Sequence, residues 1–391
     1  MNTLTVLGGA NVDGSCYIAE INGVRMMFDC GAKPGAKYNE NIDISSPETI
    51  DIIFISHAHL DHIGAIAYAA SVCKNAKIYA SPMTAFFLSY QLSSTIAGYI
   101  GANTEALRYH NKLLCNMIMN RIENVEFREK HEHTTASGEK CLFTFFQAGH
   151  MPGASMIYVQ VDNRTILYTG DFTSRETPLT GGYDLPDNLN VDTLLMCGLH
   201  ANEPEFSLSQ KSIGNPIQRK IVNLLTTGPK IIIPTTQLTK GIELIEMIKD
   251  MIERNVIYDN CTVYLGKNLM NLAREFERRS SIFTLPPFIK SLSDRSVSNH
   301  GNEKEIVIGE YQEIKPVFKK YGQLNPMFTL HEDYGGLVSL INKLKPNNVF
   351  VVHINHRVDN PCIYNDDSID SCVSIYAPKN GECCLLTKGD Q

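Results

Sequence analysis

Hydrophobic positions in the first half of the chain predict mainly strands. Asn22-Gly23 lies between two apolar stretches and predicts a hairpin turn. The uninterrupted apolar run "DIIFIS" over 51–56 predicts a strand buried on both faces. Helical spacing follows over 63–73 and from about 83 to 121. Further apolar runs predict strands over 3–9, 15–31, 77–81, 142–150, 155–172 and 193–200.

The second half shows a different pattern, in which helical and strand segments alternate. This alternation predicts a parallel sheet. Residues 286–305 carry Pro, Ser, Asn and Gly and predict an irregular connection. Two patterns in 391 residues indicate two domains, or one domain with a large insertion. The segments are helices over 216–228, 241–255, 268–280 and 337–345, and strands over 230–236, 261–266 and 347–356.

Composition narrows the class of protein. With 43% hydrophobic and 20% charged residues, the chain has the balance of a globular protein. A formal charge of -7 argues against coating nucleic acid through overall basicity, although a local basic groove remains open. The eleven cysteines form no CxxC pair, and we find no signal peptide and no apolar run of about 18 residues. We therefore expect a reduced, cytoplasmic protein with no membrane partner.

The stretch "SHAHLDHIG" over 56–64 places four zinc-type donors on one loop: His57, His59, Asp61 and His62. One loop cannot enclose a metal ion, so further donors must come from other strand ends. His150 ends "LFTFFQAGH" and Asp171 ends "TILYTGD", and both are candidates. Isolated histidines are more often core or surface residues, so we assign no site role to His110, His131, His133, His200 or His300.

These motifs resemble the metallo-β-lactamase superfamily. "HAHLDH", "AGHMPGAS" and "TGDF" match its segments in order over about the first 175 residues, as do "DGSC" and "FDCG". The resemblance implies an α/β fold, a four-layer αββα sandwich, with two zinc ions. One zinc would be held by His57, His59 and His150, and the other by Asp61, His62 and Asp171, with Asp171 bridging. Asp29 would support the histidine loop by hydrogen bonding rather than bind metal.

The second half resembles the β-CASP nucleases, which carry an inserted α/β cap domain. "PTTQLTKGIELIEMI" and "FTLHEDYGGLVSLINKLKPNNVFVVHINH" carry this likeness. His331 falls on the family's motif B histidine and His353 on its motif C histidine. By this resemblance His353 completes the second zinc site, and His331 contacts the scissile phosphate as a general acid or charge stabiliser. His356 is expected at the surface or in a supporting role.

The chain departs from the family at motif A, where Cys197 occupies the acidic position of "LMCGLHANEPE". Glu203 and His200 are possible substitutes for that acid. The insertion is also short for the family. The implied organisation is a core over 1–204, a β-CASP-like cap over 205–330 and a return to the core over 331–391, with the site in the cleft between core and cap.

The resemblance implies zinc-dependent hydrolysis of nucleic-acid phosphodiesters by in-line attack of a hydroxide that bridges the two zincs. Single-stranded RNA is favoured and DNA is left open, with Asp61 and His331 as catalytic residues. Lys240 and Lys267 are candidates for substrate binding. Arg274, Arg278 and Arg279 extend that track or form a solvated helix face. Alternatives are a hydrolase of a small ester, thioester or cyclic phosphodiester, and a catalytically silent scaffold subunit. A homodimer or a protein partner is also left open.

Overall fold

The computed structural model describes residues 2–386 except for ten short segments. Its internal contacts divide the chain into two compact units. Unit 1 comprises Met1–Ser174, Gly182–Ser209 and Leu330–Gln391, and unit 2 comprises Arg175–Gly181 and Gln210–Thr329. Residues 175–181, predicted to belong to the first domain, lie in unit 2. The segments not described, among them those with His300 and His356, are 33–41, 101–103, 207–213, 229, 258–260, 296–303, 317–321, 325–328, 356–357 and 359–360.

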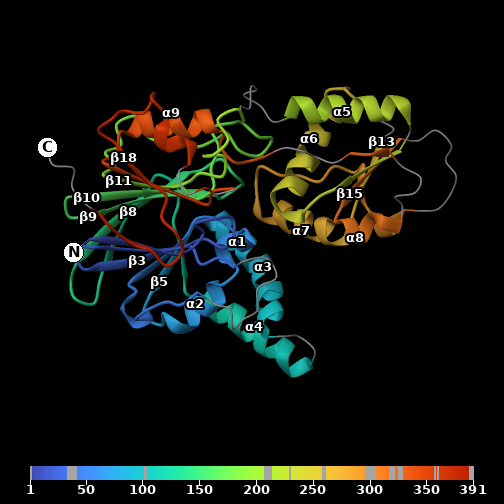
Figure 1. The fold of residues 1–391 in the computed structure, drawn as a ribbon. Coiled ribbons are helices and arrows are strands. Elements are labelled where there is room, and N and C mark those ends of the chain that lie inside the picture. The colour runs from blue at the N-terminus through green and yellow to red at the C-terminus, as the bar shows by residue number, and fades with distance from the viewer. Residues whose placement is uncertain are drawn as a thin grey trace. The chain divides into compact units, whose positions relative to one another are not determined.

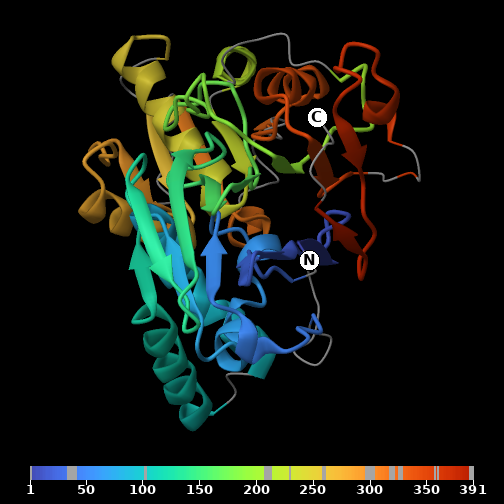
Figure 2. The same cartoon turned by 90° about the vertical axis from the view of Figure 1, so that its left-hand side faces the viewer.

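Unit 1 is built on two seven-stranded sheets. The first sheet has the order β19-β1-β2-β3-β4-β5-β6, antiparallel from β19 to β3 and parallel from β3 to β6. Its strands are β1 (Thr3–Gly8), β2 (Cys16–Ile21), β3 (Val24–Phe28), β4 (Ile52–Ile55), β5 (Lys77–Ala80), β6 (Ile122–Asn124) and β19 (Cys383–Leu385). In Figure 2 the C-terminal strand lies beside the N-terminal one, in agreement with the pairing of β19 with β1.

The second sheet has the order β18-β17-β11-β10-β9-β8-β7. The strands from β18 to β10 are parallel, and those from β10 to β7 are antiparallel. Four neighbouring strands therefore end at the same edge of the sheet. The strands are β7 (Lys130–Thr134), β8 (Lys140–Gln147), β9 (Ser155–Val161), β10 (Arg164–Tyr168), β11 (Thr193–Cys197), β17 (Asn348–Val352) and β18 (Ser374–Tyr376).

Helices cover the outer faces of both sheets. Figure 1 shows α9 over the second sheet, and α2, α3 and α4 on the outer side of the first. The predicted four-layer αββα sandwich is thus confirmed. The helices of unit 1 are η2 (Pro47–Thr49), α1 (Leu60–Ile63), α2 (Ile66–Val72), α3 (Pro82–Ile100), α4 (Glu105–Met119), α9 (Tyr334–Leu344) and η6 (Cys362–Asn365). None of the helices in the described part of the chain has the length and hydropathy needed to cross a membrane.

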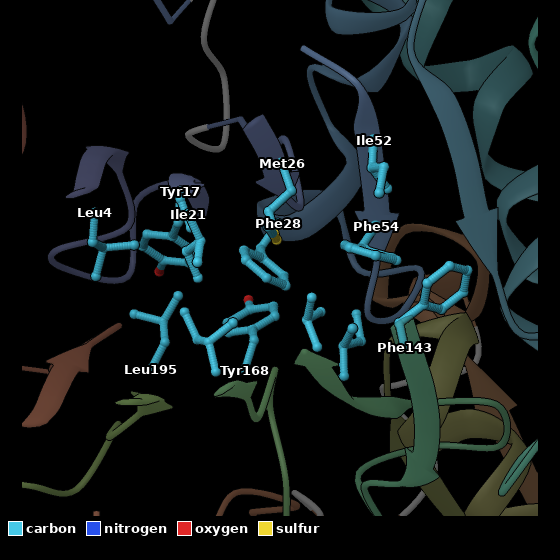
Figure 3. Close-up of a cluster of buried hydrophobic side chains, with 14 of the residues drawn as sticks. Leu4, Tyr17, Ile21, Met26, Phe28, Ile52, Phe54, Phe143, Tyr168 and Leu195 are labelled. Carbon is cyan, nitrogen blue, oxygen red and sulfur yellow. The ribbon is translucent and has the colours of Figure 1, made fainter. Parts of the chain in front are cut away.

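The core of unit 1 lies between the two sheets. Figure 3 shows Phe28 and Phe54 of the first sheet facing Phe143 and Tyr168 of the second. Phe54 packs 5.1 Å from Phe143, and Phe28 packs 5.3 Å from Tyr168, measured between ring centroids. Each such side chain, fully buried, contributes roughly 1.5–3 kcal/mol relative to exposure. The core thereby fixes the strand ends that carry the polar residues described below.

The predicted hairpin forms at Asn22 and Gly23, which join β2 to β3. Both residues have positive φ, 47° and 87°, as a two-residue hairpin turn requires. The same backbone region is occupied by Asp29, with φ of 56°, at the end of β3. A non-glycine residue in this region costs about 1–3 kcal/mol and is kept only where its surroundings demand it. We therefore expect the Asp29 side chain to make contacts that stabilise this backbone conformation.

Unit 2 is a five-stranded sheet with the order β14-β13-β15-β12-β16, in which all described pairings are parallel. This confirms the parallel sheet predicted from the alternating pattern. The expectation that 286–305 is irregular was wrong in part, because β14 forms within it and pairs with β13. The strands are β12 (Lys230–Pro234), β13 (Cys261–Leu265), β14 (Ile289–Ser291), β15 (Lys304–Gly309) and β16 (Gly322–Gln323). The helices are α5 (Gly214–Thr227), the π-helix η3 (Gln237–Gly241), α6 (Ile242–Glu253), α7 (Lys267–Arg279), η4 (Leu292–Asp294) and α8 (Tyr311–Ile314).

Candidate metal centre

Strand ends of unit 1 bring the predicted donors together. The fully buried strand β4 ends at Ile55, and the histidine loop follows it directly into α1. His150 follows β8 by three residues, Asp171 follows β10 by three, and His353 comes directly after β17. The side chains of five donors are buried although they are polar, which is costly unless they bind a partner: His57, His62, His150, Asp171 and His353.

The first group of donors is formed by His57, His59, His150 and Asp171. Nδ1 of His59 lies 3.2 Å from Nε2 of His57 and 3.1 Å from Nε2 of His150. Oδ2 of Asp171 lies 3.6 Å from Nε2 of each of these two histidines. Donor atoms at the corners of a tetrahedron around an ion about 2.0–2.1 Å away are about 3.3 Å apart. The four side chains therefore fit one tetrahedral metal ion.

A second group is formed by Asp61, His62 and His353. Oδ2 of Asp61 lies 3.8 Å from Nε2 of His353, and Oδ1 of Asp171 lies 3.5 Å from Nε2 of His62. Asp171 thus directs one oxygen toward each group. The structure brings together all seven residues that the sequence analysis assigned to metal binding, and it shows His/Asp clusters that could hold metal.

Three inner atoms of these groups form no hydrogen bond within the described residues. Both carboxylate oxygens of Asp171 and Nε2 of His62 are buried and form none within the described residues. Although burial opposes it, His353, His331 and His62 hold the pKa of Asp171 well below its usual range. Burial lowers the pKa of His57 well below its usual value and that of His59 to about 4. Although burial opposes it, Asp171 and Asp29 raise the pKa of His62 well above its usual value. Asp171 is thus ionised beside the neutral imidazoles of His57 and His59, and this is the protonation state that binds a cation.

Asp29 holds the outer side of the histidine loop. Its Oδ2 accepts hydrogen bonds from Nδ1 of His62 at 2.8 Å, from the Ser56 hydroxyl at 2.6 Å and from the Tyr168 hydroxyl at 2.7 Å. Its Oδ1 accepts from the Ser56 amide at 2.7 Å. The Ser56 hydroxyl also lies 3.0 Å from Nδ1 of His57. Asp29 therefore contacts the loop as predicted. Ser56 and Tyr168 were not predicted, although Ser56 directly precedes His57.

Two further donors are oriented through their outer ring nitrogens. Nδ1 of His150 donates to the Leu330 carbonyl at 2.9 Å, and Nδ1 of His353 lies 3.2 Å from the Ser15 hydroxyl. His353 also has a positive φ of 56°. Such outer hydrogen bonds fix the ring orientation and the tautomer of metal-binding histidines. The sequence carried no signal for the Leu330 contact, which joins residues 180 positions apart.

His331 lies beside the metal donors. Its Nδ1 is 3.7 Å from Oδ2 of Asp171, and its ring centroid is 4.7 Å from that of His150 and 6.0 Å from that of His353. Its side chain keeps 22% exposure, against 1% for Asp171. Burial lowers the pKa of His331 well below its usual value. It is thus an edge residue of the cluster, and its side chain stays partly exposed to solvent.

The motif A position shows no acid. Cys197 is the last residue of β11 and is buried, and burial raises the pKa of its thiol well above the usual value. The two candidates for its replacement, His200 and Glu203, pair with each other instead, at 2.9 Å between Nδ1 and Oε2. Asp171 is a carboxylate that pairs with His331, at 3.7 Å from Nδ1.

The predicted substrate-binding lysines belong to unit 2. Lys240 lies in η3 and is partly buried, and burial lowers its pKa. Lys267 is the exposed first residue of α7. Arg274, Arg278 and Arg279 are exposed on the same helix, where Arg278 pairs with Glu275. Their role in binding substrate stays a prediction.

Residues 10–196 match the family described as the metallo-beta-lactamase superfamily. Residues 10–196 are thus similar to a domain of this superfamily. It is 26% identical over 303 residues to an RNase J-like protein of Methanocaldococcus jannaschii, covering 76% of this chain and 66% of the relative. It is 27% identical over 289 residues to cleavage and polyadenylation specificity factor subunit 3 of Dictyostelium discoideum, covering 70% of this chain and 36% of that protein. The predicted resemblance is therefore confirmed, although the chain spans less than two thirds of these relatives.

A solved structure is similar to the whole chain. It is a protein of unknown function from Enterococcus faecalis V583, with a TM-score of 0.62 and 14% sequence identity. The likeness covers 98% of this chain and 99% of that protein. At this identity it supports the fold alone.

Proposed function

We propose that this chain is a dizinc hydrolase that cleaves phosphodiester bonds in single-stranded RNA. The observation that carries the proposal is the position of His331, partly exposed and 3.7 Å from a carboxylate that two donor groups share. A histidine at this position can supply the proton or the positive charge that the leaving oxygen of a phosphodiester takes up.

In this proposal His57, His59, His150 and Asp171 hold one zinc ion, and Asp61, His62, Asp171 and His353 hold the other. Imidazole and carboxylate donors at these separations suit zinc. When bound, a pair of such ions polarises a phosphoryl oxygen and supplies a nucleophile at neutral pH. The protein contributes rigidity, because Asp29, Ser15 and the Leu330 carbonyl fix the rings from outside.

His331 would act on the side of the leaving group. The side chain of His331 is more exposed than that of Asp171. In this proposal it contacts the phosphate while its Nδ1 stays near Asp171. A neutral imidazole donates a hydrogen bond to the departing oxygen, and a protonated one transfers its proton. The positively charged side chains of Lys240 and Lys267 would bind neighbouring phosphates of the RNA strand.

The names of the relatives support RNA as the substrate. One is named an RNase J-like protein, and the other a cleavage and polyadenylation specificity factor subunit. We infer RNA rather than DNA from this agreement. The eleven cysteines are all unpaired, which is typical of a reducing compartment, and we propose a cytoplasmic location.

The test compares end-labelled single-stranded RNA and DNA of equal sequence, incubated with zinc-loaded protein and with the Asp61→Ala variant. We expect the wild type to cut RNA and the variant to leave it intact. The fragment ladder then separates an endonuclease from an exonuclease. If zinc is bound and neither strand is cut, the nuclease proposal fails. Thioesters and cyclic phosphodiesters are then the substrates to test.

A further inference from the structure

Cys197 occupies the middle of a row of three donor side chains. β10, β11 and β17 are neighbouring parallel strands, and Cys197 at the end of β11 pairs in register with Val352 of β17. Asp171 follows β10, and His353 follows β17. Because carboxyl ends of parallel strands share one sheet edge, the three side chains meet there. Sγ of Cys197 and the donor atoms of Asp171 and His353 all lie within 4.8 Å of one another.

The backbone of Cys197 is anchored by a hydrogen bond, whereas its sulfur atom makes only a weak one. The amide of Cys197 donates to the Thr169 hydroxyl at 3.0 Å, which anchors the backbone. Sγ itself lies 3.9 Å from the Tyr168 hydroxyl, which already donates its proton to Asp29. On its other side, Asp171 presents two buried oxygens without a hydrogen bond among the described residues. A sulfur atom held beside such a carboxylate and an imidazole has the surroundings of a metal ligand.

We propose that Cys197 supplies a thiolate ligand to the metal ion that Asp171 and His353 hold. This inference rests on the proposed function, since it concerns the same pair of ions. On binding, the thiol releases its proton to solvent, and a sulfur–metal bond replaces the S–H bond. The position that carries an acid in motif A of the resembling family would then carry a metal ligand in this chain.

A sulfur ligand changes which metals the site prefers. Thiolates select softer ions such as zinc, whereas carboxylate and water sites suit magnesium and manganese. We therefore expect zinc and cobalt to bind the second site much more tightly than manganese does. In a Cys197→Ala variant this preference should shrink at the second site. The first site, formed by His57, His59 and His150 with Asp171, should keep its preference.

Cobalt loading tests the proposal without any activity measurement. Metal-free protein is titrated with Co²⁺ while the near-ultraviolet thiolate-to-cobalt charge-transfer band is recorded. We expect this band to appear in the wild type as the second equivalent binds and to be absent from Cys197→Ala and Cys197→Ser. The control is Cys141→Ala, which removes another buried thiol, in β8, that belongs to none of the donor groups. It should keep the band.

The outcomes separate the two proposals. Two bound Co²⁺ ions without the band, or a band that survives in both Cys197 variants, would overturn the thiolate ligand and leave the dizinc centre standing. A wild type that binds no Co²⁺ would overturn the metal centre itself. If both Cys197 variants unfold, X-ray absorption at the zinc edge of the wild type decides, because a zinc–sulfur shell lies at about 2.3 Å.

Discussion

Oδ2 of Asp29 lies 2.8 Å from Nδ1 of His62, and both side chains are completely buried. The same oxygen accepts hydrogen bonds from Ser56 and Tyr168. One carboxylate atom thus orients a metal donor and ties the histidine loop to the second sheet. Its burial is sustained because three donors surround it, and no water is needed to satisfy it.

Asp29→Asn should weaken metal binding. The amide can keep an oxygen toward the Ser56 backbone, but it then directs an NH₂ group at three donors. We expect affinity for zinc to fall by about 10- to 100-fold, as for other partners of metal-binding histidines. Competition with a chromophoric chelator measures this. Asp51→Asn is the matched control, because Asp51 accepts from the Arg25 amide. Equal affinity in the two variants would refute the role of Asp29.

His331→Ala should abolish most RNA cleavage without removing metal. General acid–base groups contribute roughly 10²- to 10⁴-fold, and we expect a loss in this range. Zinc content should stay near two ions per chain, measured by atomic emission. The control is His110→Ala, which changes an exposed histidine of α4. A variant that loses one zinc would instead make His331 a ligand.

Donors that follow strands were predictable from the sequence. The buried run before His57 and the turns at His150 and Asp171 each carry a local signal, and the sheet order brings these ends together. The alternation of elements predicted the parallel sheet of unit 2, and the four-layer αββα sandwich was implied by the resemblance. The supporting role of Asp29 was predictable only through the resemblance of the chain to the superfamily. Nothing in the local sequence distinguishes a carboxylate that supports a metal ligand from one that binds the metal.

Contacts between distant segments were not predictable. The Leu330 carbonyl is a backbone atom, so no residue type signals its bond to His150. Residues 175–181 belong to unit 2, where the Thr177 hydroxyl donates to Glu243 at 2.6 Å. The position of Cys197 between Asp171 and His353 required the strand order, which the pattern of apolar residues does not specify.

Asp61→Ala should reduce the metal content from two ions to one. Asp61 belongs to the second donor group only, so His57, His59 and His150 keep their ion with Asp171. Turnover should be lost, because a single ion cannot place both the nucleophile and the phosphate. The measurement is zinc content together with RNA cleavage. Asp187→Ala, a change at an exposed carboxylate paired with Lys343, should alter neither. Cleavage near the wild-type rate in Asp61→Ala would contradict the two-metal arrangement.

Glu243→Gln should stabilise unit 2 at neutral and alkaline pH. Glu243 is 1% exposed, and burial raises its pKa to about 8 from 4.5, although the Thr177 hydroxyl lowers it in part. The folded carboxyl therefore keeps a proton that the unfolded chain has lost. This stabilisation is fully present below about pH 4.5 and is lost as pH rises through about 8.

The glutamine variant cannot ionise, so its stability should change less across this window. The gain over wild type should be near zero at pH 4.5 and grow to a few kcal/mol by pH 8, at roughly 1.4 kcal/mol per pKa unit. Urea unfolding between pH 4.5 and 9 measures it. Glu275→Gln in α7 is the control, since Glu275 is paired at the surface with Arg278. Parallel pH profiles for Glu243→Gln and wild type would show that Glu243 is ionised in the folded protein.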